Sequence, residues 1–351
     1  MSNYDLLATD SYWMKDEQLP IILSTRVRLA RNLADIPFPQ VMNEAEAKDV
    51  EKKVADCFRN FTLEDEKLIY IPLSELSPVE KKVMVEKHLI SPLFADRSVG
   101  RGIVLSESHK VALMVNEEDH LRIQVLLPGD RLSEALELAG VIDDHLDSCL
   151  NVAYKDKFGY LTSCPTNVGT GLRVSVMVHL PALALTNQTQ SVLAALSPLG
   201  LAVRGIFGEG SKAYGNIFQI SNQITLGKSE EDSLTHLEAV AKQLVEHEMQ
   251  ARKILKKESS IFIEDKVWRA RGVLENARLL TAEEMLSLLS EDRLGIEMDI
   301  LPRVQIGFVA LFVNSLPGCL QYRTKKNLDG QAMNLERANY LRKLYRERKD
   351  R

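Results

Sequence analysis

The sequence has few of the residues that mark disulfide-rich, metal-binding or membrane-spanning proteins. Only 4 of its 351 residues are cysteine, and Cys57, Cys149, Cys164 and Cys319 form no CxxC pair. No group of histidines and cysteines has the sequence spacing of a zinc site, so we expect no metal held by protein ligands. No apolar run is long enough to span a membrane, and the acidic N-terminal stretch lacks the apolar segment of a signal peptide. These absences predict a cytoplasmic protein without membrane contact.

Common nucleotide-binding loops and an excess of positive charge are also missing. Neither GxxxxGK[ST] nor GxGxxG occurs, so a nucleotide site would have to be a cradle of arginine side chains, with Mg²⁺ held mainly by phosphates and water. The net charge of -5 argues against direct nucleic-acid binding. The basic run at 342–349 contains an acid and is typical of a solvated helix face. His247–Ala251 begins like the zinc-protease HExxH motif but lacks its second histidine.

Hydrophobic periodicity predicts an α+β fold with an antiparallel sheet, followed by a helical segment. Short apolar runs separated by polar turns favour antiparallel pairing. The expected strands are 22–29, 102–106, 110–116, 121–127, 172–180 and 216–221. The expected helices are 43–60, 78–90, 130–150, 186–199 and 229–257, and the chain is helical almost throughout after them. We place a boundary near Ser259, which gives a mixed domain over 1–258 and a helical domain over 259–351.

Several arginines stand at or near the ends of the expected strands. Arg26 and Arg28 alternate, so both lie on one face of strand 22–29, among apolar neighbours. Arg122, Arg173 and Arg204 occupy similar strand–loop positions. A lone arginine is most often a solvated surface residue. Planar guanidinium groups also bind phosphate oxygens and keep their charge at any relevant pH, and the paired positions favour that interpretation.

Two acidic segments contain the candidate residues for binding and deprotonating a cationic substrate. Glu117, Glu118 and Asp119 are consecutive, which is typical of a solvated turn. Alternatively, one carboxylate faces a cleft, where it holds a guanidinium and takes its proton. A guanidinium has a pKa above about 12 and needs such a base before it can attack phosphorus. Glu209 lies among glycines and is either part of a plain hairpin loop or a second carboxylate for that guanidinium. Cys164 is either an inert cysteine or a thiolate beside the bound cation.

Together these segments resemble the phosphagen (guanidino) kinase family. The matching strings are Ser24–Arg28, Asn116–Arg122, Cys164–Arg173, Arg204–Gly205 with Gly208–Glu209, and Ile220–Asn222, which cover roughly residues 20–255. The resemblance implies a catalytic domain built on an antiparallel sheet flanked by helices. It also implies ATP as phosphoryl donor, with Mg²⁺.

The same resemblance implies residue roles. Glu118 is implied to be the catalytic base, Glu209 the second guanidinium-binding carboxylate and Cys164 the substrate-site cysteine. In the family's metabolite kinases a nucleotide-contacting histidine usually stands where this sequence has Met177. The implied ATP-binding residues are Ser24, Thr25, Arg26, Val27, Arg28, His88, Arg122, Arg173, Val174, Ser175, Val176, Met177, Arg204, Gly205, Ile206, Phe207, Gly208 and Glu209.

The order of segments resembles one bacterial branch of the family, the protein-arginine kinases. Creatine and arginine kinases carry a helical N-terminal domain before the first arginine string, whereas only 23 residues precede Ser24 here and a helical segment follows 258. This resemblance implies phosphorylation of arginine side chains in proteins, with 259–351 recognising protein substrate or phosphoarginine. That branch carries an Arg-Asp-x-x-Arg-Ala motif for phosphoarginine. The aligned string Met333–Ala338 keeps only Arg337 and Ala338, so we expect a degenerate phosphoarginine pocket.

Partners are implied by the same resemblance. It suggests a homodimer, protein substrates with exposed arginine, the activator McsA, a heat-shock repressor as substrate, and a Clp chaperone-protease that receives the marked proteins in stress. Two alternatives stay open. One is a kinase of free arginine or another small guanidino compound, which shares all the strings. The other is a catalytically dead adaptor, against which the presence of Glu118, Glu209 and Cys164 argues.

Overall fold

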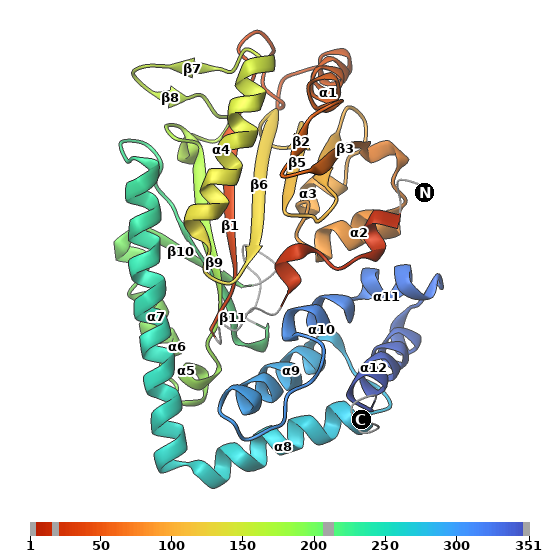
Figure 1. Cartoon of the computed structure of the whole chain (residues 1–351), viewed down its shortest axis with the longest axis vertical. Coiled ribbons are helices and arrows are strands. Elements are labelled where there is room, and N and C mark those ends of the chain that lie inside the picture. The colour runs from red at the N-terminus through yellow and green to blue at the C-terminus, as the bar shows by residue number, and fades with distance from the viewer. Residues whose placement is uncertain (1–4, 16–20, 206–213, 347–351) are drawn as a thin grey trace. The chain divides into compact units, whose positions relative to one another are not determined.

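The computed structural model describes residues 5–15, 21–205 and 214–346 (Figure 1). The strands are β1 (Ile22–Arg31), β2 (Thr62–Leu63), β3 (Glu66–Pro72), β4 (Gly102–Ser106), β5 (Val111–Val115), β6 (Leu121–Pro128), β7 (Tyr154–Lys155), β8 (Gly159–Tyr160), β9 (Leu172–His179), β10 (Leu201–Gly205) and β11 (Ile217–Asn222). The helices are α1 (Glu44–Phe58), α2 (Pro78–Glu86), α3 (Pro92–Ala95), α4 (Leu132–Cys149), α5 (Pro181–Leu185), α6 (Thr189–Ala194), α7 (Glu230–Glu258), α8 (Ser260–Asn276), α9 (Ala282–Glu297), α10 (Phe308–Asn314), α11 (Pro317–Thr324) and α12 (Gly330–Arg346).

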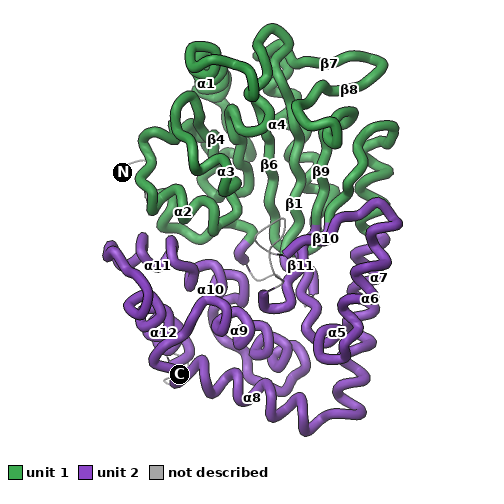
Figure 2. The backbone as a smooth tube through the Cα atoms, turned by 180° about the vertical axis from the view of Figure 1, so that it is seen from behind, with its two compact units in different colours: residues 1–13, 24–175, 221–238 green, residues 14–23, 176–220, 239–351 purple. Residues whose placement is uncertain are grey.

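The chain divides into two compact units, which Figure 2 shows in green and purple. Unit 1 contains residues 1–13, 24–175 and 221–238, and unit 2 contains 14–23, 176–220 and 239–351. The sequence boundary expected near Ser259 falls inside unit 2, between the end of α7 and the start of α8. The division into compact units therefore does not coincide with that boundary, because unit 2 also contains residues 176–220 and most of α7.

A large sheet carries the motif-bearing strands. Across the described residues its strand order is β10-β11-β9-β1-β6-β5-β4-β3-β2. The pairs β1–β6, β5–β6, β4–β5 and β3–β4 are all antiparallel. The expected antiparallel pairing of the runs near 102, 110 and 121 is therefore confirmed. The strands β9, β1 and β6, which carry most of the predicted arginines, are adjacent in this order.

Two helices of unit 1, α1 and α2, begin at strong capping residues. The Asn43 side chain accepts hydrogen bonds from the backbone N–H groups of Ala45 and Glu46, and the Glu46 carboxylate accepts one from Asn43 N, so α1 starts with a capping box. Ser77 and Glu80 form the same box for α2. Helix α1 packs on β3, β4 and β5, and α4 packs on β6 (Figure 1). These helices bury one face of the sheet.

Two predicted helices were wrong in detail, and some short strands were missed. The expected helix 186–199 is replaced by the shorter α6, which starts only at Thr189, and a 3₁₀ turn at Ser197–Leu199. Asn187 adopts the left-handed conformation with φ of 56°, so no helix continues through it. The expected helix 78–90 stops at Glu86, since His88 is left-handed with φ of 58°. The strand β3 and the hairpin β7–β8 were not predicted.

Unit 2 is largely helical after its share of the sheet. Helix α9 lies at its centre and packs on α5, α8 and α10, while α12 packs on α8 and α11. Thr281 caps α9 by accepting a hydrogen bond from Glu284 N. Within the described ranges, no helix is both long and apolar enough to cross a membrane.

Candidate active site

Strand register places three of the predicted arginines on one face of the sheet in unit 1. Arg26 and Arg28 alternate along β1, so their side chains share a face. In the β1–β6 pairing, Arg28 lies opposite Gln124 and Ala30 lies opposite Arg122. Residues directly across an antiparallel pair point to the same side. Arg26, Arg28 and Arg122 therefore project from the same face of the sheet.

The arginines form a cluster of like charge that the protein itself neutralises only in part. Burial lowers the pKa of Arg28 well below its ordinary value, and the positive charges of Arg26, Arg122 and Arg173 lower it further, while Glu117 partly opposes them. The buried Nε of Arg28 has no hydrogen-bond partner within the part of the chain that the structure describes. The triphosphate of ATP has the negative charge and the oxygen acceptors to bind such a cluster.

The acidic string forms a tight turn between β5 and β6. Asn116 adopts the left-handed conformation with φ of 63°, which asparagine tolerates better than most residues. Its backbone N–H donates to His120 O at 2.8 Å, and its side-chain amide donates to Ala47 O at 2.9 Å and Gly100 O at 2.6 Å. Asn116 is therefore a structural residue that anchors the turn.

Asp119 and His120 are also used to hold the turn in place. The buried Asp119 carboxylate accepts from Asn32 Nδ2 at 2.6 Å and from Ser163 N at 2.7 Å. The backbone N–H of Leu33 donates to His120 Nδ1 at 3.1 Å. The proton of the neutral ring therefore sits on Nε2, which donates to the carbonyl oxygen of Pro37 at 3.0 Å.

The two glutamates of the turn have different environments. Glu117 accepts hydrogen bonds from Arg122 Nη1 and Ser91 Oγ, both at 2.5 Å. Although burial alone would raise the pKa of Glu117, the Arg122 charge and these hydrogen bonds lower it below the ordinary value. Glu117 is thus a fixed anion that orients Arg122, a role that the sequence did not predict for it.

Glu118 is the unengaged acid of the turn. Its side chain is exposed, and within the described residues its carboxylate makes no hydrogen bond. Partial burial of the carboxyl group raises the pKa of Glu118, and the charges of Asp119 and Glu117 raise it further, while Arg122 and Arg173 oppose the shift. A carboxylate with a raised pKa that is free to meet a substrate has the properties of a general base.

The loop that carries Cys164 is tied to the same turn. Ser163 N donates to the Asp119 carboxylate, and Thr162 Oγ1 donates to Cys164 O at 2.8 Å. The half-buried Cys164 places its Sγ 3.0 Å from Thr166 Oγ1. The hydrogen bond to Asp119 therefore links the loop of the predicted substrate-site cysteine, Cys164, to the turn that carries Glu118.

His88 lies beside the arginine cluster. Burial, followed by the charge of Arg26, lowers the pKa of His88 to about 3, so the ring is neutral at physiological pH. The ring packs edge-on against Trp13 with centroids 5.3 Å apart, and the carbonyl oxygen of His88 accepts from Gln124 Nε2 at 2.7 Å. A neutral ring beside these arginines is compatible with the predicted contact to nucleotide, which stays a prediction.

Several of the predicted ATP-binding residues have structural roles. Thr25 Oγ1 donates to Gly129 O at 2.7 Å and accepts from Arg131 N at 3.1 Å. Ser175 Oγ donates to Arg26 O at 3.3 Å. The side chains of Ser24, Val27, Val174, Val176 and Met177 are buried in the strands. These residues build the strands from which the arginines project.

Other predicted residues belong to unit 2 or lie outside the described residues. Val176, Met177, Arg204 and Gly205 belong to unit 2. The predicted residues Ile206, Phe207, Gly208 and Glu209 lie outside the described residues. Arg337 is buried in unit 2, where it donates to Ser315 O at 2.9 Å, to Leu280 O at 2.7 Å and to Asn334 Oδ1 at 2.9 Å. The neighbouring Ala338 is fully buried.

Comparison with known families agrees with this geometry. The family model of the ATP:guanido phosphotransferase C-terminal catalytic domain matches residues 49–251. The model of the protein-arginine kinase McsB C-terminal domain matches residues 260–351. Among solved structures, a duplicated taurocyamine kinase from Schistosoma mansoni is similar with a TM-score of 0.61 and 27% identity, over 70% of this chain and 35% of that one. A lombricine kinase is similar with a TM-score of 0.56 and 25% identity, over 70% of both chains.

Curated relatives match nearly the whole chain. A protein-arginine kinase of Brevibacillus brevis is 45% identical over 96% of this chain and 95% of its own length. A protein-arginine kinase of Moorella thermoacetica is 46% identical over 96% of this chain and 98% of its own length. The resemblance seen in the sequence strings is thereby confirmed. The chain belongs to the protein-arginine kinase family of ATP:guanido phosphotransferases.

Proposed function

We propose that the chain transfers the γ-phosphoryl group of ATP to the guanidinium group of arginine side chains in proteins. The observation that carries this proposal is the joint placement of a partly neutralised arginine cluster and the unengaged Glu118 carboxylate in one unit. The first feature suits a polyphosphate. The second suits the cation that must lose a proton to become a nucleophile.

Charge neutralisation is the first contribution of the chain's residues. Arg26, Arg28, Arg122 and Arg173 bind the phosphate oxygens, and the Glu117 ion pair fixes the direction of the Arg122 guanidinium. Bound Mg²⁺, held mainly by the phosphates and water, supplies further neutralisation of phosphate charge. Phosphoryl transfer needs little covalent chemistry from a protein, so oriented cations provide most of the stabilisation of the transition state.

Activation of the acceptor is the second contribution. Glu118 binds the substrate guanidinium and accepts one of its protons as the nitrogen attacks phosphorus. The new N–P bond forms while the bond from the γ-phosphorus to the bridging oxygen breaks, so ADP leaves with the electron pair of that bond. Cys164 orients the guanidinium from the neighbouring loop. Glu209 is proposed as a second carboxylate, and Arg204 as a further phosphate ligand, from the sequence alone.

The choice of protein arginine as acceptor is supported by the relatives. The matched proteins are named protein-arginine kinases, and the model of the McsB C-terminal domain covers 260–351. We accordingly propose catalysis by 1–258 and recognition of protein substrate by 259–351. Recognition of phosphoarginine at Arg337 and Ala338 would require Arg337 to exchange its present contacts for the ligand.

Further aspects of the proposal rest on the family resemblance. On that basis we propose that the protein forms a homodimer, is cytoplasmic and acts in the stress response. The proposed partners are McsA, a heat-shock repressor and a Clp chaperone-protease. The four free cysteines are compatible with a reducing compartment.

The proposal is tested by offering two acceptors with ATP and Mg²⁺: an unfolded arginine-containing protein and free arginine. We expect phosphoarginine in the protein, detected by mass spectrometry, and little turnover of free arginine. Glu118→Gln should lower kcat by about 10²–10⁴-fold. The matched control is Glu107→Gln, since Glu107 is an exposed glutamate in the β4–β5 turn of the same unit.

Two outcomes would contradict the proposal. Free arginine as the preferred acceptor would favour a metabolite kinase, and failure to bind or consume ATP would favour a non-catalytic adaptor. Turnover by Glu118→Gln equal to that of Glu107→Gln would remove the base assignment while leaving the reaction itself in place.

A further inference from the structure

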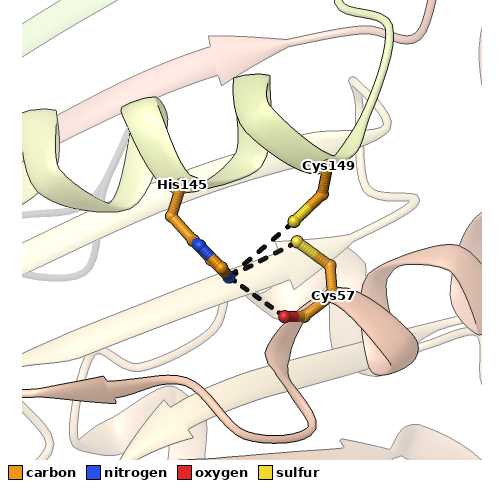
Figure 3. A group of neighbouring side chains, drawn as sticks. All are labelled: Cys57, His145 and Cys149. Atoms are coloured by element: carbon orange, nitrogen blue, oxygen red, sulfur yellow. Dashed lines mark hydrogen bonds between the residues drawn. The ribbon is translucent and has the colours of Figure 1, made fainter.

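A second group of reactive side chains lies in unit 1 outside the arginine and glutamate site. Cys57, in the last turn of α1, meets His145 and Cys149 of α4 (Figure 3). His145 and Cys149 are four residues apart and therefore share one face of their helix. One ligand atom from each of the three residues lies within 4.8 Å of the others. The sequence alone gave no sign of this group, because Cys57 and His145 are separated by 88 positions.

The distances in this group match the edges of a tetrahedral metal centre. His145 Nε2 lies 3.5 Å from Cys57 Sγ and 3.9 Å from Cys149 Sγ. Zinc bonds are about 2.3 Å to sulfur and about 2.0–2.1 Å to nitrogen, so tetrahedral angles separate neighbouring ligand atoms by about 3.5–3.8 Å. A cation could therefore enter between the three atoms with little movement of the two helices.

The imidazole is already held in a defined orientation. The His145 ring stacks on Phe61 with centroids 4.0 Å apart and meets the edge of Phe58 at 5.2 Å. His145 Nε2 lies 3.0 Å from the carbonyl oxygen of Cys57, to which it can donate (Figure 3). Metal binding would replace this hydrogen bond and move the ring proton to Nδ1. A ring fixed by packing loses little freedom when it becomes a ligand.

We propose that Cys57, His145 and Cys149 form a binding site for a thiophilic divalent cation of the Zn²⁺ class. The ligand set contains two sulfurs and one imidazole nitrogen, which suits zinc and not magnesium, because magnesium prefers oxygen ligands. Cys149 is exposed, so the fourth position is open to water. The site is independent of the Mg²⁺ that accompanies ATP.

Such a site would join the end of α1 to the end of α4. Cysteine binds a metal as its thiolate, so metal binding by these thiols would release protons. A cation that binds only the folded arrangement also stabilises that arrangement.

The test is a titration of reduced, chelator-stripped full-length protein with Co²⁺, a spectroscopic stand-in for Zn²⁺. We expect about one equivalent to bind, with thiolate-to-cobalt charge-transfer absorption that Zn²⁺ abolishes by displacement. Cys149→Ser, at an exposed position, should weaken binding by about 10–100-fold without unfolding the protein. His145→Gln should weaken it similarly. Cys164→Ser serves as the cysteine control and should titrate like the unaltered protein.

Three results would overturn the assignment. One is the absence of charge-transfer absorption at one equivalent. Another is a Cys149→Ser variant that titrates like the unaltered protein. The last is reduced protein that binds no Co²⁺ but forms a Cys57–Cys149 disulfide under mild oxidation, which would identify a redox pair in place of a metal site.

Discussion

The side chain of Asn32 joins the first strand to the acidic turn by a hydrogen bond of 2.6 Å from its Nδ2 to Asp119 Oδ1. The side-chain Oδ1 of Asn32 accepts from His120 N at 2.9 Å, so one buried side-chain amide holds two consecutive residues of the turn. The position of Glu118, which precedes them, depends on this amide.

Replacing Asn32 by aspartate should therefore disturb both stability and catalysis. Asn32→Asp brings a second carboxylate against Asp119 in a buried place and removes a donor, which we expect to cost about 2–3 kcal/mol of unfolding free energy. Urea denaturation measures the loss. The matched control is Asn151→Asp, because exposed Asn151 donates to Asp35 at 2.8 Å. There the cost should stay below about 1 kcal/mol, and equal effects at both positions would contradict the role of Asn32.

The pH dependence of catalysis should report the raised pKa of Glu118. A general base works only when deprotonated, so kcat/KM should rise with pH through a pKa above the ordinary glutamate value. Glu117→Gln removes a negative neighbour that raises this pKa and frees Arg122, which lowers it. We expect the acid limb of the kcat/KM profile to move to lower pH in this variant. A limb that stays in place or moves upward would disprove the coupling.

Arg28 should oppose folding while it supports ATP binding. Its lowered pKa means that the charged form is less favourable in the folded than in the unfolded protein, so at neutral pH the charge reduces stability. Arg28→Met keeps an apolar stem and should raise the unfolding free energy by about 1 kcal/mol. The same change should weaken ATP binding by about 10–100-fold, because charge-assisted hydrogen bonds to phosphate are lost.

The control for this pair of effects is Arg97→Met, at an exposed arginine of the same unit. Its stability should change by less than about 0.5 kcal/mol, with ATP affinity unchanged. Calorimetry of ATP binding and thermal unfolding of the free protein give the two readouts. A destabilised Arg28→Met variant with intact ATP affinity would contradict both expectations.

In unit 2, Glu248 is expected to be a stability residue. Its carboxylate accepts from Ala182 N at 3.0 Å and Leu183 N at 2.9 Å at the start of α5, and from Arg252 Nε at 2.9 Å. Glu248→Ala leaves these donors buried without their acceptor and should cost about 3 kcal/mol in denaturant unfolding. Glu246→Ala, at an exposed position on the same helix, should cost less than about 0.5 kcal/mol. Similar losses in both variants would show that the buried carboxylate is dispensable.

Local periodicity predicted the parts of the fold that local interactions determine. The strands near 102, 110 and 121 and the helix starts at Ser77 and Thr281 follow from alternation and capping within a few residues. The left-handed Asn187, which delays the helix expected from 186 until Thr189, was missed because a left-handed residue other than glycine leaves little trace in composition. The short hairpin β7–β8 offers too few residues for periodicity to detect.

For the site, the sequence predicted which types of residue are present better than it predicted the role of each one. Guanidinium chemistry requires an acid, but the choice between Glu117 and Glu118 depends on which one Arg122 and Ser91 engage, and contacts across the fold decide that. The same limit applies to Asn32, whose partners lie 87 and 88 positions away. Long-range contacts of this kind also hid the Cys57–His145–Cys149 group.

The β1–β6 register limits how the first arginine strand can change in length. Arg28 lies opposite Gln124, with buried Val27 and Leu29 on either side. Inserting or deleting one residue within the strand would exchange the two sets of side chains, turning guanidinium groups toward the hydrocarbon interior and aliphatic groups toward the phosphates. The segment from Ser24 to Arg31 should therefore tolerate substitutions but not insertions or deletions. Libraries that seek altered nucleotide preference can vary its side chains but should not vary its residue count.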